Sequence, residues 1–209
     1  MESVVGTMHQ KEVGNITGFG DIPQSGEKRE QLNLALSLTK QFETVYDKLP
    51  NVAWLYYTSE EDFIYMYPFI SSKDFFFSPV LHEEVFYKNA APEANPFRES
   101  VWTPVYLDHA GKGLMVTLSS PIYEGDSFKG VVSLDLTNDL LNSYLSSDYE
   151  SYLVDDKNAI IAKYKTSGFN DKAESLTEVL HIDDRELEKL QQAEIGKMKR
   201  VGMHYVYAM

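Results

Sequence analysis

The sequence predicts an α+β fold in which a long N-terminal helix packs on a central antiparallel sheet, followed by an incomplete second unit. Three observations support this fold class. Residues 27–49 carry apolar side chains at helical spacing until Pro50 stops the pattern. Residues 101–135 alternate strand-like stretches with tight-turn residues, as an antiparallel meander does. From Tyr152 onward, a pattern of hairpin, helix and strand begins again.

The helix expected over residues 27–49 has an unusually wide apolar face, because Leu34 and Leu38 broaden its stripe. Such a face either covers the sheet on one side and contacts a second subunit on the other, or it is entirely core. Residues 14–26 before it are rich in glycine and contain Pro23, so they are expected to be a connection. The N-terminal piece before this connection is expected to be the tail of another helix.

The central elements are expected in the order strand, strand, short helices and meander. Strands are predicted over residues 51–58 and 63–68, and short helices over residues 71–90, where Ser78 and Pro79 open one of them. The meander contributes strands over residues 101–107, 114–121 and 129–135. A helix capped by residues 137–139 and running to Leu145 closes the first domain.

Two domains are expected, over residues 1–147 and 148–209. The second contains a hairpin in YLVDDKNAIIAKY and a helix in DDRELEKLQQAE capped by Asp183 or Asp184, with Leu187 and Leu190 inward. Residues 198–209 form an alternating strand that ends with no turn or partner, which indicates that this second unit is incomplete.

Composition excludes several classes of protein. A net charge of -13 argues against nucleic acid, because no basic stripe is present to neutralise phosphates. The absence of cysteine excludes disulfides, thiol catalysis and cysteine-based zinc sites, and is compatible with the bacterial periplasm as well as with the cytosol. No stretch approaches the roughly 20 apolar residues of a membrane span, and the first residues do not resemble a signal peptide. The membrane anchors of any receptor containing this chain are therefore expected outside these residues.

Catalytic motifs are incomplete, so we expect no enzyme, no cofactor and no metal site in this chain. His82-Glu83-Glu84 lacks the second histidine of a metalloprotease helix, and no G-x-S-x-G element accompanies His109. Gly111-Lys112-Gly113 lacks the other residues of a phosphate loop. One enzymatic alternative stays open, a hydrolase using Glu83, Glu84 and Asp135 as acid and base.

Three linked motifs carry a family resemblance. They are W-T-x-x-Y-x-D, then G-K-G-x-M-V-T-x-S-x-P-I-Y, then F-x-G-V-V-x-x-D-L-T, all within residues 102–137. Residues 52–145 thereby resemble the PAS-like sensor domains called Cache or PhoQ–DcuS–CitA domains, and the restart at Tyr152 resembles the second unit of a double Cache region. The resemblance implies an extracytoplasmic, noncatalytic sensor on the periplasmic side of the bacterial inner membrane.

The resemblance also implies partners. A small ligand would bind between the sheet and residues 71–100, and two copies would associate along the N-terminal helices. The output would be a GGDEF diguanylate cyclase or a histidine kinase elsewhere on the polypeptide, with a chemoreceptor or a free periplasmic solute-binding protein as alternatives.

Ligand residues follow from the family motif for amino acids, which is Arg-x-Trp-Tyr before the meander, a later tyrosine and a final aspartate. Tyr87 matches the motif tyrosine, Tyr106 the later one and Asp135 the aspartate, while Phe86 stands at the tryptophan position and Glu84 at the arginine position. Since an acid cannot pair with a carboxylate as arginine does, an α-amino acid held in the usual way is disfavoured.

The same substitution favours a cationic ligand. Asp135 and Glu84 would bind an ammonium group, and Phe86, Tyr87, Tyr106 and Trp102 would supply aromatic walls. All four aromatic residues have core packing as their competing interpretation. For Asp135, the competing interpretation is a cap on the following helix. In a further alternative, Arg98 binds a ligand carboxylate.

Overall fold

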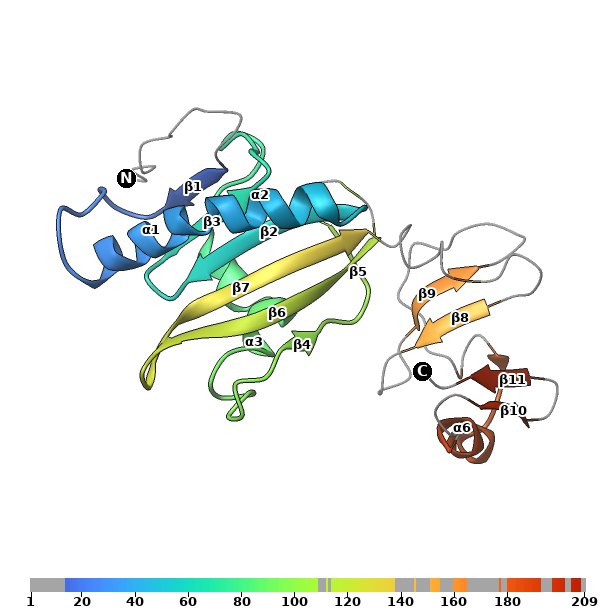
Figure 1. The fold of residues 1–209 in the computed structure, drawn as a ribbon. Coiled ribbons are helices and arrows are strands. Elements are labelled where there is room, and N and C mark those ends of the chain that lie inside the picture. Colours follow the sequence, from blue (N-terminus) through green and yellow to red (C-terminus); the bar gives the residue numbers. More distant parts are fainter. Residues whose placement is uncertain are drawn as a thin grey trace.

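The computed structural model describes residues 14–108, 112, 114–137, 145, 151–154, 160–164, 177, 180–192, 197–201 and 204–207. Its main body is an antiparallel sheet in the order β1-β3-β2-β7-β6-β4, with β5 also paired to β6 (Figure 1). The predicted α+β class, with N-terminal helices packed on an antiparallel sheet, is confirmed. The strands are β1 (Asn15–Gly18), β2 (Val52–Ser59), β3 (Phe63–Tyr67), β4 (Val101–Trp102), β5 (Tyr106–Leu107), β6 (Leu114–Glu124) and β7 (Ser127–Thr137).

The hairpin β6–β7 is the longest pairing in the sheet and extends beyond the two strands predicted for it. Gly125 turns the chain with a φ of 61°, which glycine adopts without a steric cost. The predicted strand over residues 101–107 is instead two short strands, β4 and β5, which pair with different parts of β6. Thr103 between them still bonds β6, since its backbone N–H donates to the Thr117 carbonyl at 2.9 Å.

The single N-terminal helix predicted over residues 27–49 is divided into α1 (Glu27–Ser37) and α2 (Thr39–Lys48). The break has a local cause. The Thr39 hydroxyl lies 2.7 Å from the Leu36 carbonyl and 2.7 Å from the Tyr65 hydroxyl, and the Leu38 N–H donates to the carbonyl of Ala35, three residues back. A serine or threonine hydroxyl that competes for helix carbonyls bends or interrupts a helix.

Strand β1 was predicted as part of a glycine-rich connection, and that prediction is wrong. Residues 15–18 pair with β3 at the edge of the sheet. Gly18 is required by this pairing, because a Cβ there would lie 2.5 Å from the Phe63 Cβ. Glycine is uncommon in strands except where another chain segment approaches closely, so composition alone pointed to a loop.

The two faces of β2 serve different parts of the core. Leu55 and Tyr57 join the cluster under α1 and α2, where Phe42 stacks on Tyr65 with ring centroids 5.8 Å apart. Trp54 belongs to the cluster on the other face. That second face is covered by the predicted short helices, η1 (Pro79–His82) and α3 (Val85–Lys88). Alternation along one strand thus separates a helix-packed side from the side where the candidate site lies.

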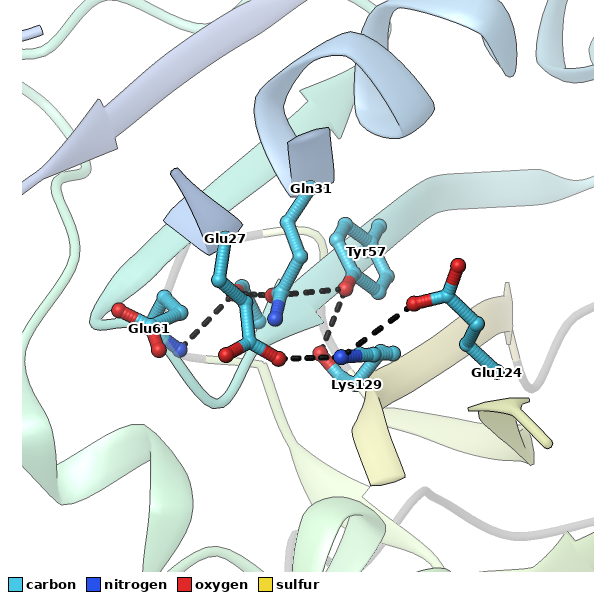
Figure 2. A network of polar contacts seen from close by, with 7 residues as sticks. Glu27, Gln31, Tyr57, Glu61, Glu124 and Lys129 are labelled. Carbon is cyan, nitrogen blue, oxygen red and sulfur yellow. Dashed lines mark hydrogen bonds and ion pairs between the residues drawn. The ribbon is translucent and has the colours of Figure 1, made fainter. Parts of the chain in front are cut away.

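A polar cluster fixes the start of α1 to the sheet (Figure 2). The Gln31 Oε1 atom accepts hydrogen bonds from the Ser59 hydroxyl and, at 3.1 Å, from the Tyr57 hydroxyl. The Lys129 ammonium group forms an ion pair with Glu27, and the Lys129 carbonyl lies 2.5 Å from the Tyr57 hydroxyl. Helix α1 is therefore tied to β2 by the buried side chains of Gln31, Tyr57 and Ser59, and to β7 by the ion pair between Lys129 and the exposed Glu27.

Among the described residues of the C-terminal part, the strands form two two-stranded sheets, and residues 184–191 form a helix. Hairpin β8 (Ser151–Val154) and β9 (Ile160–Tyr164) was predicted, as was helix α6 (Asp184–Gln191), which Asp183 caps by accepting from the Glu186 N–H at 2.8 Å. The strand predicted without a partner over residues 198–209 is in fact a hairpin of β10 (Met198–Val201) and β11 (His204–Tyr207). The predicted N-terminal helix tail, the helix up to Leu145 and the boundary at residue 147 lie outside the described residues.

Candidate ligand-binding site

A cavity of about 50 Å³ lies between the sheet and the segment that carries η1 and α3. This volume exceeds the roughly 10–15 Å³ that one water molecule needs, so the space accepts a small group of ligand atoms. Apolar walls with a few convergent polar groups are typical of small-molecule sites. The lining residues are Trp54, Tyr56, Ile64, Met66, Phe75, Leu81, Glu84, Phe86, Tyr106, Asp108 and Asp135.

Asp135 is the most buried acid of the cavity, with 3% of its surface exposed. Strand β7 places it between Trp54 of β2 and Thr117 of β6. Its Oδ1 atom accepts hydrogen bonds from the Thr117 hydroxyl at 2.7 Å and from the Tyr56 hydroxyl at 3.0 Å. Since Thr117 uses its only proton on Asp135, the Tyr106 hydroxyl donates to Thr117, at 2.8 Å.

Burial controls the protonation of this group. Loss of solvent raises the pKa of Asp135 to about 7, although the hydrogen bonds from Thr117 and Tyr56 oppose the rise. Burial likewise raises the pKa of Tyr56 and of Tyr106 far above the ordinary value. Both phenols therefore stay neutral at physiological pH, and their hydroxyl groups act as donors that hold the Asp135 carboxyl group and Thr117 in place.

Asp108, Trp54 and Lys112 form a second polar group beside Asp135. The Asp108 Oδ2 atom accepts from the Trp54 indole N–H at 3.3 Å and from the Lys112 backbone N–H at 2.9 Å. The Lys112 ammonium group lies 3.7 Å from the centroid of the Trp54 ring and donates to the Ala53 carbonyl at 2.7 Å. Asp108 thus fixes the orientation of the indole and the start of the segment that carries Lys112.

Four of the seven residues predicted for the site line the cavity, namely Glu84, Phe86, Tyr106 and Asp135. Phe86 also packs edge-on against the Tyr56 ring, with centroids 5.2 Å apart, so it is both a wall of the cavity and part of the core. Asp135 faces this cavity and bonds Tyr56 and Thr117. The helix that it was alternatively expected to cap lies outside the described residues.

The other three predicted residues lie elsewhere. Tyr87 is buried in the core, with its ring against His82 and Phe128, at centroid distances of 4.5 and 6.0 Å. Trp102 on β4 is 51% exposed and does not line the cavity. Arg98 is held at the β6–β7 turn, where its guanidinium donates to the Gly125 carbonyl at 3.0 Å.

Arg98 has two further contacts at that turn. Its guanidinium forms an ion pair with Asp126 at 2.8 Å and lies 4.0 Å from the centroid of the Tyr123 ring. These contacts hold the only arginine considered from the sequence away from the residues that line the cavity.

Sequence reasoning assigned no site role to Trp54, Tyr56 or Asp108. A signal was present for all three. Trp54 and Tyr56 alternate along a predicted strand and therefore share one face, and Asp108 ends the W-T-x-x-Y-x-D motif. What the sequence lacked was the pairing of β2 with β7, which places the two aromatic side chains beside Asp135.

The described residues contain no cluster of three histidine, aspartate or glutamate side chains arranged to hold a metal ion. Glu83, one of the acids considered for a hydrolase, pairs with Lys88 at 2.5 Å on the surface and does not line the cavity. Within the described ranges, no helix has the length and apolar character of a membrane span.

Comparison with known proteins identifies a family and a fold. The family model described as "Methyl-accepting chemotaxis protein-like, first PDC sensor domain" matches residues 26–143. No curated protein matches the chain in sequence. The chain spans about two thirds of the length of the solved CtaA and Tlp3 domains.

Two solved chemoreceptor domains are similar in fold. One is the ligand-binding domain of Pseudomonas fluorescens CtaA in complex with L-leucine, with a TM-score of 0.55, 18% identity, and coverage of 83% of this chain and 68% of that chain. The other is the sensory domain of Campylobacter jejuni Tlp3 with isoleucine bound, with a TM-score of 0.50, 17% identity, and coverage of 86% and 66%. At these identities the likeness concerns the fold alone.

The family match agrees with the resemblance to Cache and PhoQ–DcuS–CitA (PDC) sensor domains drawn from the meander motifs. Its region contains α1, α2, the sheet from β2 to β7, and every residue that lines the cavity. Because the match extends over more than half of the chain, the protein belongs to the methyl-accepting chemotaxis protein-like, first PDC sensor domain family.

Proposed function

We propose that this chain is the extracytoplasmic sensor region of a membrane receptor and binds a small ligand bearing an ammonium group. The buried carboxylate of Asp135 carries the proposal, because it faces a cavity walled by Trp54, Tyr56, Phe86 and Tyr106. An ammonium group gains both charge-assisted hydrogen bonds to a carboxylate and attraction to aromatic faces. Few other ligand groups would use both features at once.

The charges around the cavity favour an amine over an α-amino acid. Three acids, Glu84, Asp108 and Asp135, are among its lining residues, and none of the described lining residues is an arginine or lysine. A ligand carboxylate inside this lining would be repelled by the acids without a direct basic partner. The amino acids named for CtaA and Tlp3 therefore belong to those proteins, and we propose a simple primary amine here.

The proposed output follows from the family rather than from the site. Similarity to chemotaxis sensor domains favours a methyl-accepting chemoreceptor, in place of the diguanylate cyclase or histidine kinase output expected from the sequence. The output region and the membrane anchors would be carried by other parts of the polypeptide. Ligand binding on the periplasmic side would then control signalling in the cytoplasm.

Thermal shift with a panel of amines, amino acids and carboxylates tests the ligand class. Ligands with an ammonium group are expected to raise the melting temperature, since a ligand that binds only the folded state stabilises it. Asp135→Ala should abolish the shift in a folded protein, and Glu84→Ala should reduce it less. Arg98→Ala is the matched control and should leave the shift unchanged, because Arg98 is engaged at the hairpin turn.

The opposite pattern would contradict the proposal. A carboxylate without an ammonium group would have to stabilise the protein, and this effect would have to survive Asp135→Ala but disappear with Arg98→Ala. Arg98 would then be the ligand anchor.

We also propose that the receptor is a homodimer through its N-terminal helices. Leu34 and Leu38 lie partly buried against the core beneath α1 and α2, which leaves part of each side chain exposed for a second subunit. Association is expected to be weak in the isolated chain, because the buried area is small without membrane anchors. Sedimentation equilibrium at high concentration measures it, and a strictly monomeric chain would support the pure core interpretation.

A further inference from the structure

Lys112 brings a positive charge to the cavity without lining it. Its ammonium group lies 3.7 Å from the centroid of the Trp54 ring, and Trp54 is one of the aromatic walls of the cavity. A hydrogen bond of 2.7 Å to the Ala53 carbonyl holds the ammonium there, and the backbone N–H is held by Asp108 at 2.9 Å. The Lys112 ammonium group is therefore a cation that already contacts the Trp54 indole in the protein without ligand.

The charge of Lys112 interacts with the acids of the site. Partial burial lowers the pKa of Lys112, and the nearby charges of Asp108 and Asp135 oppose this change. Because Asp108 and Asp135 attract the Lys112 charge, Lys112 in turn weakens the net electrostatic attraction that a second cation feels at the site. An incoming ammonium group would gain the attraction of the acids and at the same time feel the repulsion of Lys112.

We propose that Lys112 is a specificity-determining residue that limits the positive charge of the ligand and selects monocations over dications. This inference rests on the proposed function, since it concerns the ligand that Asp135 binds. The geometry that carries it is independent of any ligand: a lysine ammonium fixed by a backbone carbonyl against the wall of a cavity that contains three acids. A second ligand ammonium would add repulsion for which the lining offers no matching site.

The size of the effect follows from Coulomb's law. Two unit charges about 8 Å apart, at an effective dielectric constant of about 40, repel each other enough to change affinity roughly fivefold. A dication brings two charges near Lys112, so its affinity is expected to change by more than that of a monocation. A zwitterion carries a carboxylate that Lys112 attracts as well as an ammonium group that it repels, so the two effects offset and its affinity is not expected to rise when Lys112 is neutralised.

The experiment compares three probes of matched length, propylamine, 1,3-diaminopropane and β-alanine, by titration calorimetry on the whole 209-residue chain. With Lys112→Met, propylamine should bind about fivefold more tightly and 1,3-diaminopropane should gain more, while β-alanine should not gain. Lys112→Arg keeps the charge and the position over Trp54, and should stay within about twofold of the unmodified protein. Lys48→Met removes the same charge from α2 on the opposite face of the sheet, and should change none of the three.

A second measurement needs no ligand. If the Lys112 charge reaches the site, Lys112→Met should raise the pKa of the Asp135 carboxyl group in an NMR titration, and Lys48→Met should not. The melting temperature of each variant shows whether it remains folded.

Failure of this inference is distinguishable from failure of the proposed function. If the probes bind in an Asp135-dependent way but Lys112→Met changes all three equally or not at all, the role of Lys112 is refuted and the ammonium site stands. If no probe binds the unmodified protein, the ammonium site is refuted. The role of Lys112 in ligand selection is then refuted as well, whatever the titration shows, because it rests on that site.

Discussion

Replacing Asp135 with asparagine is expected to remove a large pH dependence of stability. The substitution keeps the shape of the side chain, and the asparagine Oδ1 atom can still accept the hydrogen bonds from Tyr56 and Thr117. It removes only the ability to ionise. The comparison of the two proteins therefore isolates the free energy of charging a buried carboxyl group beside a cavity.

The magnitude follows from the pKa. Burial raises the pKa of Asp135 from 3.8 to about 7. At roughly 1.4 kcal/mol per pKa unit, ionising this group in the folded protein costs about 4 kcal/mol relative to the unfolded chain. Between about pH 4 and pH 7 the folded protein retains a proton that the unfolded chain has lost, so stability falls as pH rises. Above pH 7 the loss is complete.

Urea denaturation at pH 5 and pH 8 measures this effect. The free energy of unfolding of Asp135→Asn, relative to that of the unmodified protein, should increase by about 3 kcal/mol between these pH values. The increase is smaller than about 4 kcal/mol because the unmodified protein has already lost part of its stability at pH 5. The contributions of other titrating groups to the pH dependence of stability cancel in the comparison, because both proteins contain these groups. Asp74→Asn, at an exposed position, is the matched control and should show no such increase. An advantage of the same size at both pH values would refute the reasoning that burial holds Asp135 protonated.

Ligand binding is linked to the same proton. An ammonium ligand pairs with the ionised carboxylate, so its affinity should rise as pH increases through 7, and its stabilising effect should be larger at pH 8 than at pH 5. At alkaline pH the ionised Asp135 therefore destabilises the folded protein without ligand, and it favours the folded protein that has bound an ammonium group. Such opposition is common where a binding site is built from groups that are poorly satisfied without the ligand.

Four further substitutions test the sheet and the cavity. Gly130→Ala should lower the free energy of unfolding by about 2–4 kcal/mol in urea denaturation, because its Cβ would lie 2.2 Å from the Thr58 carbonyl oxygen; Gly125→Ala, with open space around it, should lower it by only about 1–2 kcal/mol. Tyr56→Phe removes a donor to the cavity carboxylate and should weaken amine binding in calorimetry at pH 7, with a smaller deficit at pH 8.5. Tyr57→Phe should cost about 1–2 kcal/mol of stability in the same urea assay, since its buried hydroxyl bonds groups from α1 and β7, and an unchanged midpoint would contradict that role.

Local sequence signals predicted most of the elements but not their interruptions. The alternation of β6 and β7 and the helical stripe of α1 and α2 are strong patterns, and the structure contains them. The break at Leu38 depends on the contact between Thr39 and Tyr65, which are distant in sequence. Strand β1 depends on a close approach to Phe63 that only glycine permits. Both features arise from tertiary contacts, which a local pattern does not contain.

For the site, the family motif located residues on the correct segments but could not decide which side chains meet. Tyr87 directly follows Phe86, yet it turns toward His82 and Phe128 while Phe86 lines the cavity. Arg98 was considered as an anchor because its charge is suitable, but Asp126 in the hairpin turn is its partner. Charge and sequence spacing identify candidate groups; the direction of each side chain is set by the packing around it.

The irregularity in β7 shows why the direction of a side chain is harder to predict from sequence than the strand that carries it. Strict alternation would place Phe128 and Val132 on the same face of the sheet. Instead, Phe128 packs with the cavity-side core and Val132 with the helix-side core, because the register shifts opposite Ile122 and Tyr123. The bulge lets Lys129 reach Glu27 on α1 while Asp135 faces the cavity. A pattern that is read without this one-residue shift assigns either the Lys129 ion pair or the Asp135 carboxyl group to the wrong side of the sheet.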